Sequence, residues 1–302
     1  YDRHWRTARV HLTTPPLPVQ PKTLNQVRTW VEKFDPGSGQ WLNTPARALQ
    51  DLGPVPYGYV KYRAQFTYAG QPTMFVATLA DDAKKVFLNG KLVAEASNTK
   101  KQADFQLAAY ARAGANLIEI AYEAFGSPNF GPTLGELQGI ESVRYGAATQ
   151  SAAAIDSWQV QRFPAPMHGR GLDPEFATSA WSTAQLDEVA AAGDLVPAFT
   201  WCRAEFPLER PDPAWWVPWK LTLEADRDAL LYLNGKFVGR FVTVGPQKDF
   251  YLPEPYLIFD VKRANTLTVV LAYTDRPQHI RTLRVEPYEE FATRQTRLEF
   301  EW

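Results

Sequence analysis

A weak internal repeat constrains the fold of this chain more than any other feature of its sequence. In each half an apolar segment runs into an Asn-Gly pair, which is the residue pair preferred by two-residue β-hairpin turns. Three segments recur in the same order: Arg63-Ala64-Gln65-Phe66 with Arg203-Ala204-Glu205-Phe206, Val86-Phe87-Leu88-Asn89-Gly90-Lys91 with Leu231-Tyr232-Leu233-Asn234-Gly235-Lys236, and Asn116-Leu117-Ile118 with Asn265-Thr266-Leu267. The repeat predicts two related modules, each an antiparallel β-sandwich.

Most apolar stretches alternate with a period of two, as expected of strands with one buried face. Helical patterns are scarce. The segment 23–34 is ambiguous, and 182–192 predicts a short helix that begins with a Ser182/Gln185 capping pair. The sequence therefore predicts an all-β fold. The residues expected on buried faces are Val60, Tyr62, Ala64 and Phe66, then Leu267, Val269, Leu271 and Tyr273, and at the end of the chain Leu298, Phe300 and Trp302.

The predicted organisation is an extended connector followed by two jelly-roll sandwiches. Residues 1–21 contain a Pro-rich run that cannot supply a regular ladder of backbone donors. The first sandwich is expected at 22–147 and the second at 157–302. A Gly/Ala/Ser-rich stretch, 148–156, is the predicted linker.

Charge and composition exclude several classes of function. The 32 Lys and Arg residues balance 33 Asp and Glu residues, so nothing favours nucleic acid or an anionic membrane as a partner. No apolar run reaches the roughly 18 residues of a membrane span. The single cysteine, Cys202, excludes an intramolecular disulfide and is expected to be a buried thiol. Because the chain begins at Tyr1 without a methionine, we expect a processed chain or a piece of a larger protein.

Three groups of motifs resemble glycoside hydrolase family 35 β-galactosidases, in their C-terminal jelly-roll (galactose-binding-like) domains. They cover roughly residues 45–145 and 198–275. Two departures affect loops: Ser127 stands where the family has arginine, and 241–244 displaces an aromatic residue. The matching motifs are Leu231 to Arg240 with Gly245-Pro246-Gln247 and Tyr251-Leu252-Pro253, then Gly126-Ser127-Pro128-Asn129-Phe130-Gly131 with Gln138-Gly139-Ile140, and Leu52-Gly53 with Tyr57 to Arg63.

The resemblance implies a partner that this chain lacks. The catalytic part of that family is a (β/α)8 barrel with two glutamates, and a barrel takes about 250 residues in an alternating strand–helix pattern. After two sandwiches are assigned, fewer than 60 residues are left at the N-terminus. We therefore expect a catalytic barrel domain or subunit as a partner and no catalytic residues in this chain. The sequence does not determine the location, although a secreted or periplasmic one is favoured.

No motif marks a metal, cofactor or nucleophile site. The four histidines have no metal-ligand spacing. Two acidic pairs, Asp81-Asp82 and Asp226 with Asp228, could supply oxygens to a structural calcium, although acidic residues before a strand are also ordinary turn residues. No cofactor is expected.

Aromatic residues are the strongest remaining signal, because sugar sites combine an aromatic platform with planar polar side chains. Trp219 continues a core face, whereas whichever of its two Trp neighbours points outward is a platform candidate. Packing against a neighbouring domain is the alternative for every candidate. The carbohydrate-binding candidates are Trp215 and Trp216, then Phe125, Asn129 and Phe130 in one loop, and Gln247 and Tyr251 in another.

Three functions are compatible with these features. The preferred one is a non-catalytic portion of a β-galactosidase-like enzyme that scaffolds the barrel and contacts galactosides. The second is a free-standing, lectin-like carbohydrate-binding protein. The third is an independent hydrolase.

Overall fold

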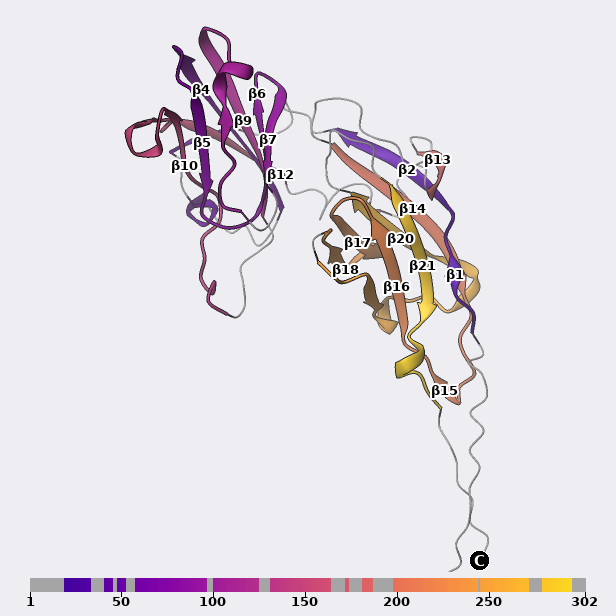
Figure 1. Cartoon of the computed structure of the whole chain (residues 1–302). Helices are drawn as coiled ribbons and strands as arrows, with labels where there is room; N and C mark the ends of the chain where they lie inside the picture. Colours follow the sequence, from indigo (N-terminus) through magenta and orange to yellow (C-terminus); the bar gives the residue numbers. More distant parts are fainter. Residues whose placement is uncertain are drawn as a thin grey trace, which may run out of the picture.

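The computed structural model describes residues 19–33, 41–45, 48–52, 58–96, 100–124, 131–163, 172–173, 181–186, 198–243, 245–271 and 279–294. These residues form two antiparallel β-sandwiches (Figure 1). The all-β jelly-roll class predicted from the sequence is confirmed. The described helical segments are single 3-10 turns: η1 (Leu49–Leu52), η2 (Leu107–Ala109), η3 (Thr149–Ser151), η7 (Glu254–Tyr256) and η8 (Glu289–Phe291). Within the described residues, no helix has the length and apolar character needed to cross a membrane.

The first sandwich packs a six-stranded sheet against a four-stranded one. The larger sheet has the order β3 (Leu42–Thr44), β12 (Trp158–Phe163), β4 (Gly58–Tyr68), β9 (Gly114–Ala124), β6 (Ala83–Leu88) and β7 (Lys91–Ala96). The smaller sheet has the order β11 (Ala153–Ala154), β10 (Ile140–Gly146), β5 (Thr73–Thr78) and β8 (Phe105–Gln106). A core with Tyr62, Phe66, Ile120 and Trp158 lies between them.

The second sandwich repeats this design. Its larger sheet has the order β13 (Ser182–Gln185), β2 (Gln26–Lys33), β14 (Ala198–Leu208), β20 (Asp260–Leu271), β17 (Ala229–Leu233) and β18 (Lys236–Phe241). Its smaller sheet has the order β1 (Lys22–Thr23), β21 (Ile280–Pro287), β16 (Trp219–Ala225) and β19 (Asp249–Leu252). A short ladder of β15 (Trp215–Trp216) with β22 (Thr293–Arg294) extends one end.

The predicted buried faces are confirmed where the structure describes them. Val60, Tyr62, Ala64 and Phe66 of β4 are buried, and so are Leu267, Val269 and Leu271 of β20. Cys202 is buried as expected, and burial raises the pKa of its thiol to about 12. Tyr273, Leu298, Phe300 and Trp302 lie outside the described residues.

The predicted helix at 182–192 is wrong where the chain is described. Residues 182–185 form strand β13, which pairs with the edge of β2 from Ser182 opposite Thr29 to Gln185 opposite Gln26. The Ser182/Gln185 spacing also occurs at the start of helices. Here the segment is an edge strand, because β2 supplies partners for its backbone N–H and C=O groups. The ambiguous segment 23–34 is resolved the same way, since β2 covers most of it.

Strand pairing shows that the first sandwich begins and ends at other residues than predicted. Strands β1 and β2, expected to open the first sandwich, belong to the second, where β2 lies beside β14 (Figure 1). The predicted linker 148–156 contains η3 and β11, and β11 pairs with β10 in the first sandwich. Strand β12, expected in the second sandwich, pairs with β3 and β4 of the first. The first sandwich is thus inserted between β2 and β13 of the second.

The two sandwiches are related by circular permutation. Their larger sheets correspond strand by strand, with β3, β12, β4, β9, β6 and β7 matching β13, β2, β14, β20, β17 and β18. In the first sandwich β11 and β12 come last in the chain. Their counterparts in the second sandwich, β1 and β2, come first. This relation explains why the repeat can be recognised in the sequence, whereas the domain boundaries predicted from it differ from those of the structure.

The repeated asparagines form the same hydrogen-bonded pair in both sandwiches. Asn89 and Asn234, each at φ 50° in its Asn-Gly turn, form the corner of a hairpin. Asn89 Nδ2 donates to Asn116 Oδ1 at 2.8 Å, and Asn234 Nδ2 donates to Asn265 Oδ1 at 2.9 Å. Each turn asparagine also accepts a backbone N–H from the strand that begins beside it, at Leu117 or Thr266. The turn and the central strand are therefore locked together.

The repeated arginines also have matching environments. Arg63 of β4 lies over the ring of Trp41 at 3.8 Å, and Arg203 of β14 lies over the ring of Trp181 at 4.6 Å. Each tryptophan directly precedes the outermost short strand of its larger sheet. The RAQF and RAEF segments therefore share a stacking contact as well as a sequence.

We expect the buried asparagines to be costly to remove. Asn265 accepts the backbone N–H of Ile258 at 2.7 Å and donates to its carbonyl at 2.8 Å, besides accepting from Asn234. Replacing Asn265 with Ala leaves these groups without partners, so the free energy of unfolding should fall by about 2 to 4 kcal/mol in urea titrations. Asn116→Ala should cost a similar amount. The exposed Asn43→Ala serves as a control, expected to cost at most about 0.5 kcal/mol; equal losses for Asn43 and Asn265 would contradict this account.

Candidate functional site

The structure places four of the seven candidate carbohydrate-binding residues. Trp216 is 50% exposed, whereas Trp215 is half-buried and packs against the core of the second sandwich. Trp219 is buried, as predicted. Of the two platform candidates, Trp216 is therefore the one that faces outward.

The candidates Gln247 and Tyr251 are also accessible. Tyr251 is 49% exposed and Gln247 is exposed, with Gln247 Nε2 donating to the backbone carbonyl of Asp249 at 3.1 Å. The third group, Phe125, Asn129 and Phe130, lies outside the described residues. Of the four described candidates, Trp216, Gln247 and Tyr251 are exposed, and the structure decides which of them share a surface.

Tyr251 stands on the outer face of the smaller sheet of the second sandwich. It lies opposite Lys220 in the β16–β19 pair, and Lys220 lies opposite Glu286 in the β16–β21 pair. Residues opposite one another on neighbouring strands share a face. Tyr251, Lys220 and Glu286 therefore form a row across this sheet, which local sequence patterns did not reveal because the three strands are distant in the sequence.

Charges on this face are arranged as a network around Thr222. Lys220 Nζ lies 2.9 Å from Asp249 Oδ2 and 3.6 Å from Glu286 Oε1. Thr222 Oγ1 lies 2.6 Å from Asp249 Oδ1 and 2.8 Å from Glu286 Oε1, and Arg284 contacts Glu286 at 3.2 Å. Burial alone would raise the pKa of Asp249, but hydrogen bonds from Lys220 and Thr222 hold that pKa below its usual value. The hydrogen bond to Asp249 raises the pKa of Lys220.

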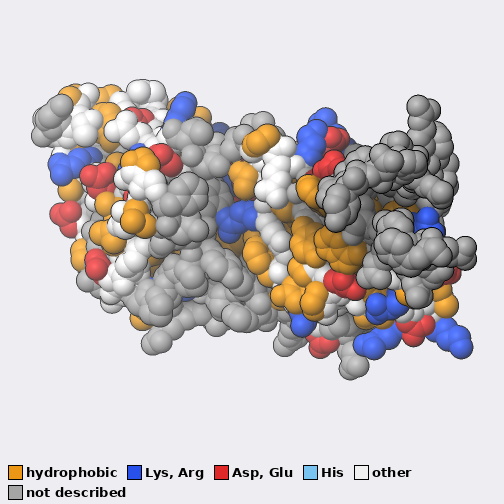
Figure 2. All heavy atoms as spheres, turned by 90° about the horizontal axis from the view of Figure 1, so that it is seen from below, with side chains coloured by type: hydrophobic (Ala, Val, Ile, Leu, Met, Phe, Trp, Pro, Cys, Tyr) orange, Lys and Arg blue, Asp and Glu red, His pale blue; other side chains and the backbone are white. Residues whose placement is uncertain are grey.

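A hollow of about 230 Å³ opens beside this network, at the end of the sheet that carries η8. Its walls are formed by Lys220 and Glu286 of the sheet, by Tyr288, Glu289 and Glu290, and by Pro21 and Pro287. Lys220 Nζ lies 4.8 Å from the centre of the Tyr288 ring. Figure 2, which views the molecule from this end, shows hydrophobic side chains gathered on the second sandwich next to acidic and basic ones. None of the hollow's wall residues was a sequence candidate; the alternation of Lys220 between buried Trp219 and Leu221 is the only signal that marked it as outward.

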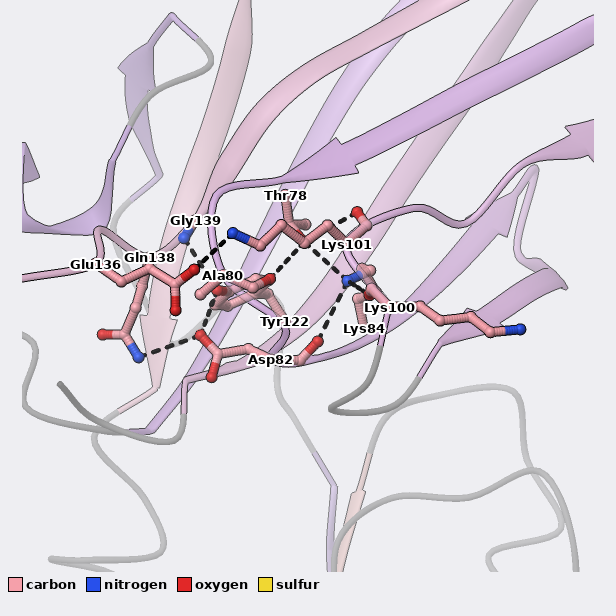
Figure 3. A network of polar contacts seen from close by, with 10 residues as sticks. All are labelled: Thr78, Ala80, Asp82, Lys84, Lys100, Lys101, Tyr122, Glu136, Gln138 and Gly139. Carbon is pink, nitrogen blue, oxygen red and sulfur yellow. Dashed lines mark hydrogen bonds and ion pairs between the residues drawn. The ribbon is translucent and has the colours of Figure 1, made fainter. Parts of the chain in front are cut away.

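A second polar cluster lies inside the first sandwich, at the Asp81-Asp82 pair considered for calcium (Figure 3). The Asp82 carboxylate accepts hydrogen bonds from Tyr122 Oη and from Gln138 Nε2, the latter at 3.1 Å. Tyr122 Oη in turn accepts the backbone N–H of Gly139 at 3.0 Å. Asp82 is therefore committed to the Gln138-Gly139 segment, which belongs to one of the motifs that resemble family 35. Among the described residues, no three His, Cys, Asp or Glu side chains are grouped as a metal site.

The other acidic pair is committed in a similar way. Asp226 Oδ1 lies 2.7 Å from Arg281 Nη2. Asp228 Oδ1 accepts hydrogen bonds from the backbone N–H and the hydroxyl of Thr243, at 2.8 and 2.9 Å. Both carboxylates hold turns of the second sandwich. Of the two roles considered from the sequence, this is the role of an ordinary turn residue.

Lys84 supplies a buried cation to the Figure 3 cluster. Its side chain is buried, and Nζ donates to Thr78 Oγ1 at 2.8 Å and to the backbone carbonyl of Lys100 at 2.6 Å. Burial disfavours the charged form and lowers the pKa of Lys84 to about 8, although Asp81 and Asp82 oppose the shift. The ammonium group ties the β5–β6 turn to the segment before β8.

The lowered pKa of Lys84 should appear as a pH dependence of stability. Because the pKa of Lys84 is about 8 in the folded protein and 10.5 for an ordinary lysine, the unfolded chain binds more protons between these values, and stability should rise with pH across this window. Relative to Lys84→Met, the wild-type chain should gain about 2 to 3 kcal/mol between pH 7 and pH 10.5 in urea titrations. If the stability of the wild type and of Lys84→Met changed equally with pH, the lowered pKa of Lys84 would be contradicted. Lys220→Met, at a lysine whose pKa is raised, is the matched control and should show no such gain.

The sandwiches meet through a mixed apolar and charged interface. On the outer face of the larger sheet of the second sandwich, Phe199, Trp201 and Tyr232 form a separate apolar cluster, against which Tyr59 of the first sandwich packs, 4.4 Å from Phe199 between ring centres. Glu123 accepts a hydrogen bond from Tyr59 and lies 3.8 Å from Arg240. Burial raises the pKa of Glu123, and Arg240 opposes this. Trp181 and Trp201 are buried in this cluster, and Trp30 packs against it.

Residues 172–277 match the family model described as the second all-beta domain of beta-galactosidase. The match covers less than half of the 302 residues and runs from the segment before β13 to the end of β20, without β1, β2 or β21. This portion of the second sandwich is therefore similar to an accessory β-domain of a glycoside hydrolase. The carbohydrate-related character of the domain agrees with the expectation from the sequence.

Several solved structures share low similarity with the chain. A lectin from Pleurotus ostreatus in complex with GalNAc is 13% identical, over 90% of this chain and 83% of that one, with a TM-score of 0.25. An alpha-L-rhamnosidase from Streptomyces avermitilis is 16% identical over 90% and 29%, with a TM-score of 0.25. A putative beta-galactosidase from Bacteroides fragilis is 13% identical over 89% and 40%, with a TM-score of 0.26. These TM-scores are too low to carry an argument, and no curated protein sequence matches the chain.

Proposed function

We propose that this chain is the non-catalytic, two-sandwich portion of a β-galactosidase-like glycoside hydrolase. Its role is to scaffold a (β/α)8 catalytic barrel and to contact galactosides near the substrate cleft. The observation that carries the proposal is the match of residues 172–277 to the second all-beta domain of beta-galactosidase. The assignment to family 35 rests in addition on the motif resemblance.

The positions of those motifs in the structure support an accessory role. Leu231 and Leu233 are buried in β17, and Asn234-Gly235 forms the turn to β18. Gln138-Gly139 is held by the Asp82 cluster. Residues that resemble the family therefore build hairpins and anchor loops, which is what a scaffold requires of them.

Buried carboxylates of the described residues are occupied in ways that do not suit glycoside hydrolysis. A retaining pair needs two carboxyl groups about 5 to 5.5 Å apart, facing a sugar. Asp82 is held by Tyr122 and Gln138 inside the first sandwich, and Glu123 is held by Tyr59 at the domain interface. Both carboxylates are therefore buried and already committed to partners within the protein.

The isolated chain should not hydrolyse galactosides. We expect no turnover of a chromogenic β-galactoside above the buffer rate, and a native gene product with a mass far above that of 302 residues, measured by mass spectrometry. Turnover that one carboxylate-to-amide substitution abolishes would instead establish the independent hydrolase.

The strongest competing function is a free-standing, lectin-like protein. The half-exposed Tyr251 and Trp216, with polar neighbours, favour this alternative because they resemble an open sugar platform. A gene product of this length that binds sugars without any barrel would support it. A barrel encoded in the same polypeptide, together with a stable contact between the two parts in size-exclusion chromatography, would support the scaffold.

A further inference from the structure

The hollow beside η8 has walls that can accept hydrogen bonds more readily than donate them. Lys220, its one basic wall residue, is already engaged by Asp249 and Glu286. Glu289 and Glu290 are exposed, and their side-chain carboxylates make no ion pair or hydrogen bond with other described residues. The groups of the hollow that are available for hydrogen bonds are therefore carboxylate acceptors. They suit a ligand that has many hydroxyl donors and no negative charge.

Exposed aromatic side chains gather around the same hollow. Four large aromatic side chains are exposed among the described residues: Trp216, Phe237, Tyr251 and Phe291. Three of them border this end of the second sandwich. Tyr251 lies opposite the wall residue Lys220. Phe291 follows Glu290 and makes an edge-to-face contact with Tyr288, 5.0 Å between ring centres. Trp216 lies opposite Thr293, two residues after Phe291.

Apolar ring faces beside hydrogen-bond acceptors match the two kinds of surface that a sugar presents, namely its C–H faces and its hydroxyl groups. An acidic sugar would meet Glu286, Glu289 and Glu290 across the hollow. A flat apolar peptide would leave these carboxylates without partners, at a cost for any that become buried. An uncharged oligosaccharide avoids both penalties.

We propose that the hollow formed by Lys220, Glu286, Tyr288, Glu289 and Glu290, bordered by Tyr251 and Phe291, is a binding subsite for a neutral oligosaccharide. This inference deepens the galactoside contact of the proposed function and rests on it. This proposal places the galactoside contact on one face of the second sandwich and not at the separate groups of candidates predicted from the sequence. Glu289 and Glu290 accept hydroxyl donors, and Tyr251 and Phe291 cover a sugar face.

Isothermal titration calorimetry of the full chain with lactose and with a neutral galactan tetrasaccharide tests the subsite, with an oligogalacturonate of equal length as the anionic comparison. Tyr251→Ala and the double variant Glu289→Gln/Glu290→Gln should each weaken binding of the neutral tetrasaccharide about tenfold, with unchanged thermal midpoints. Phe237→Ala removes an exposed aromatic side chain on β18, away from the hollow, and should leave the affinity within about twofold. The oligogalacturonate should bind more weakly than the neutral ligand.

Three results would overturn the subsite: no heat with either neutral ligand, equal affinity for the oligogalacturonate, or variants that bind as tightly as the wild type. A separate measurement of barrel association distinguishes this failure from failure of the scaffold. If the barrel binds and sugar does not, the hollow is a packing surface and only the subsite is lost. If sugar binds and no barrel associates, the subsite stands and the lectin-like function replaces the scaffold.

Discussion

The structure depends on covering both faces of the larger sheet of the second sandwich. All five residues of β17 are buried, so this sheet cannot have one face in water as most antiparallel sheets do. Its inner face packs on the core with Leu221 and Leu283, and its outer face carries Phe199, Trp201 and Tyr232. Tyr59 of the first sandwich packs on that outer face. The apolar outer face therefore ties the two sandwiches together.

The same constraint explains the inserted topology. Strand β14 needs a neighbour on the side away from β20, and β2 supplies it before the chain enters the first sandwich. The chain then returns to add β13 beside β2. Because the second sandwich holds strands from both sides of the insertion, the first sandwich is tied to it at two points.

Buried polar groups then fix the loops between the strands. The Asn89–Asn116 and Asn234–Asn265 pairs lock the hairpins, and Asp82, with Lys84 nearby, holds the segment before β10. These groups are hydrogen-bonded, as burial requires of them. The polar groups named above thus serve the structure, whereas exposed aromatic and acidic side chains lie at one end of the second sandwich.

Local patterns in the sequence determined a large part of this protein. Alternation identified the buried faces of β4 and β20, the Asn-Gly pairs located two hairpins, and the continuing face of Leu221 and Leu223 placed Trp219 in the core. These features depend on neighbours two residues apart or on turn geometry, so a single segment encodes them. Only the tertiary structure decided that β2 pairs with β14, that 182–185 is a strand, and that Tyr251, Lys220 and Glu286 form one row. Each of these outcomes is a pairing between distant segments, and many strands of similar composition satisfy the same local pattern. The choice among them is made by the burial of whole sheets, which no single segment of the sequence records.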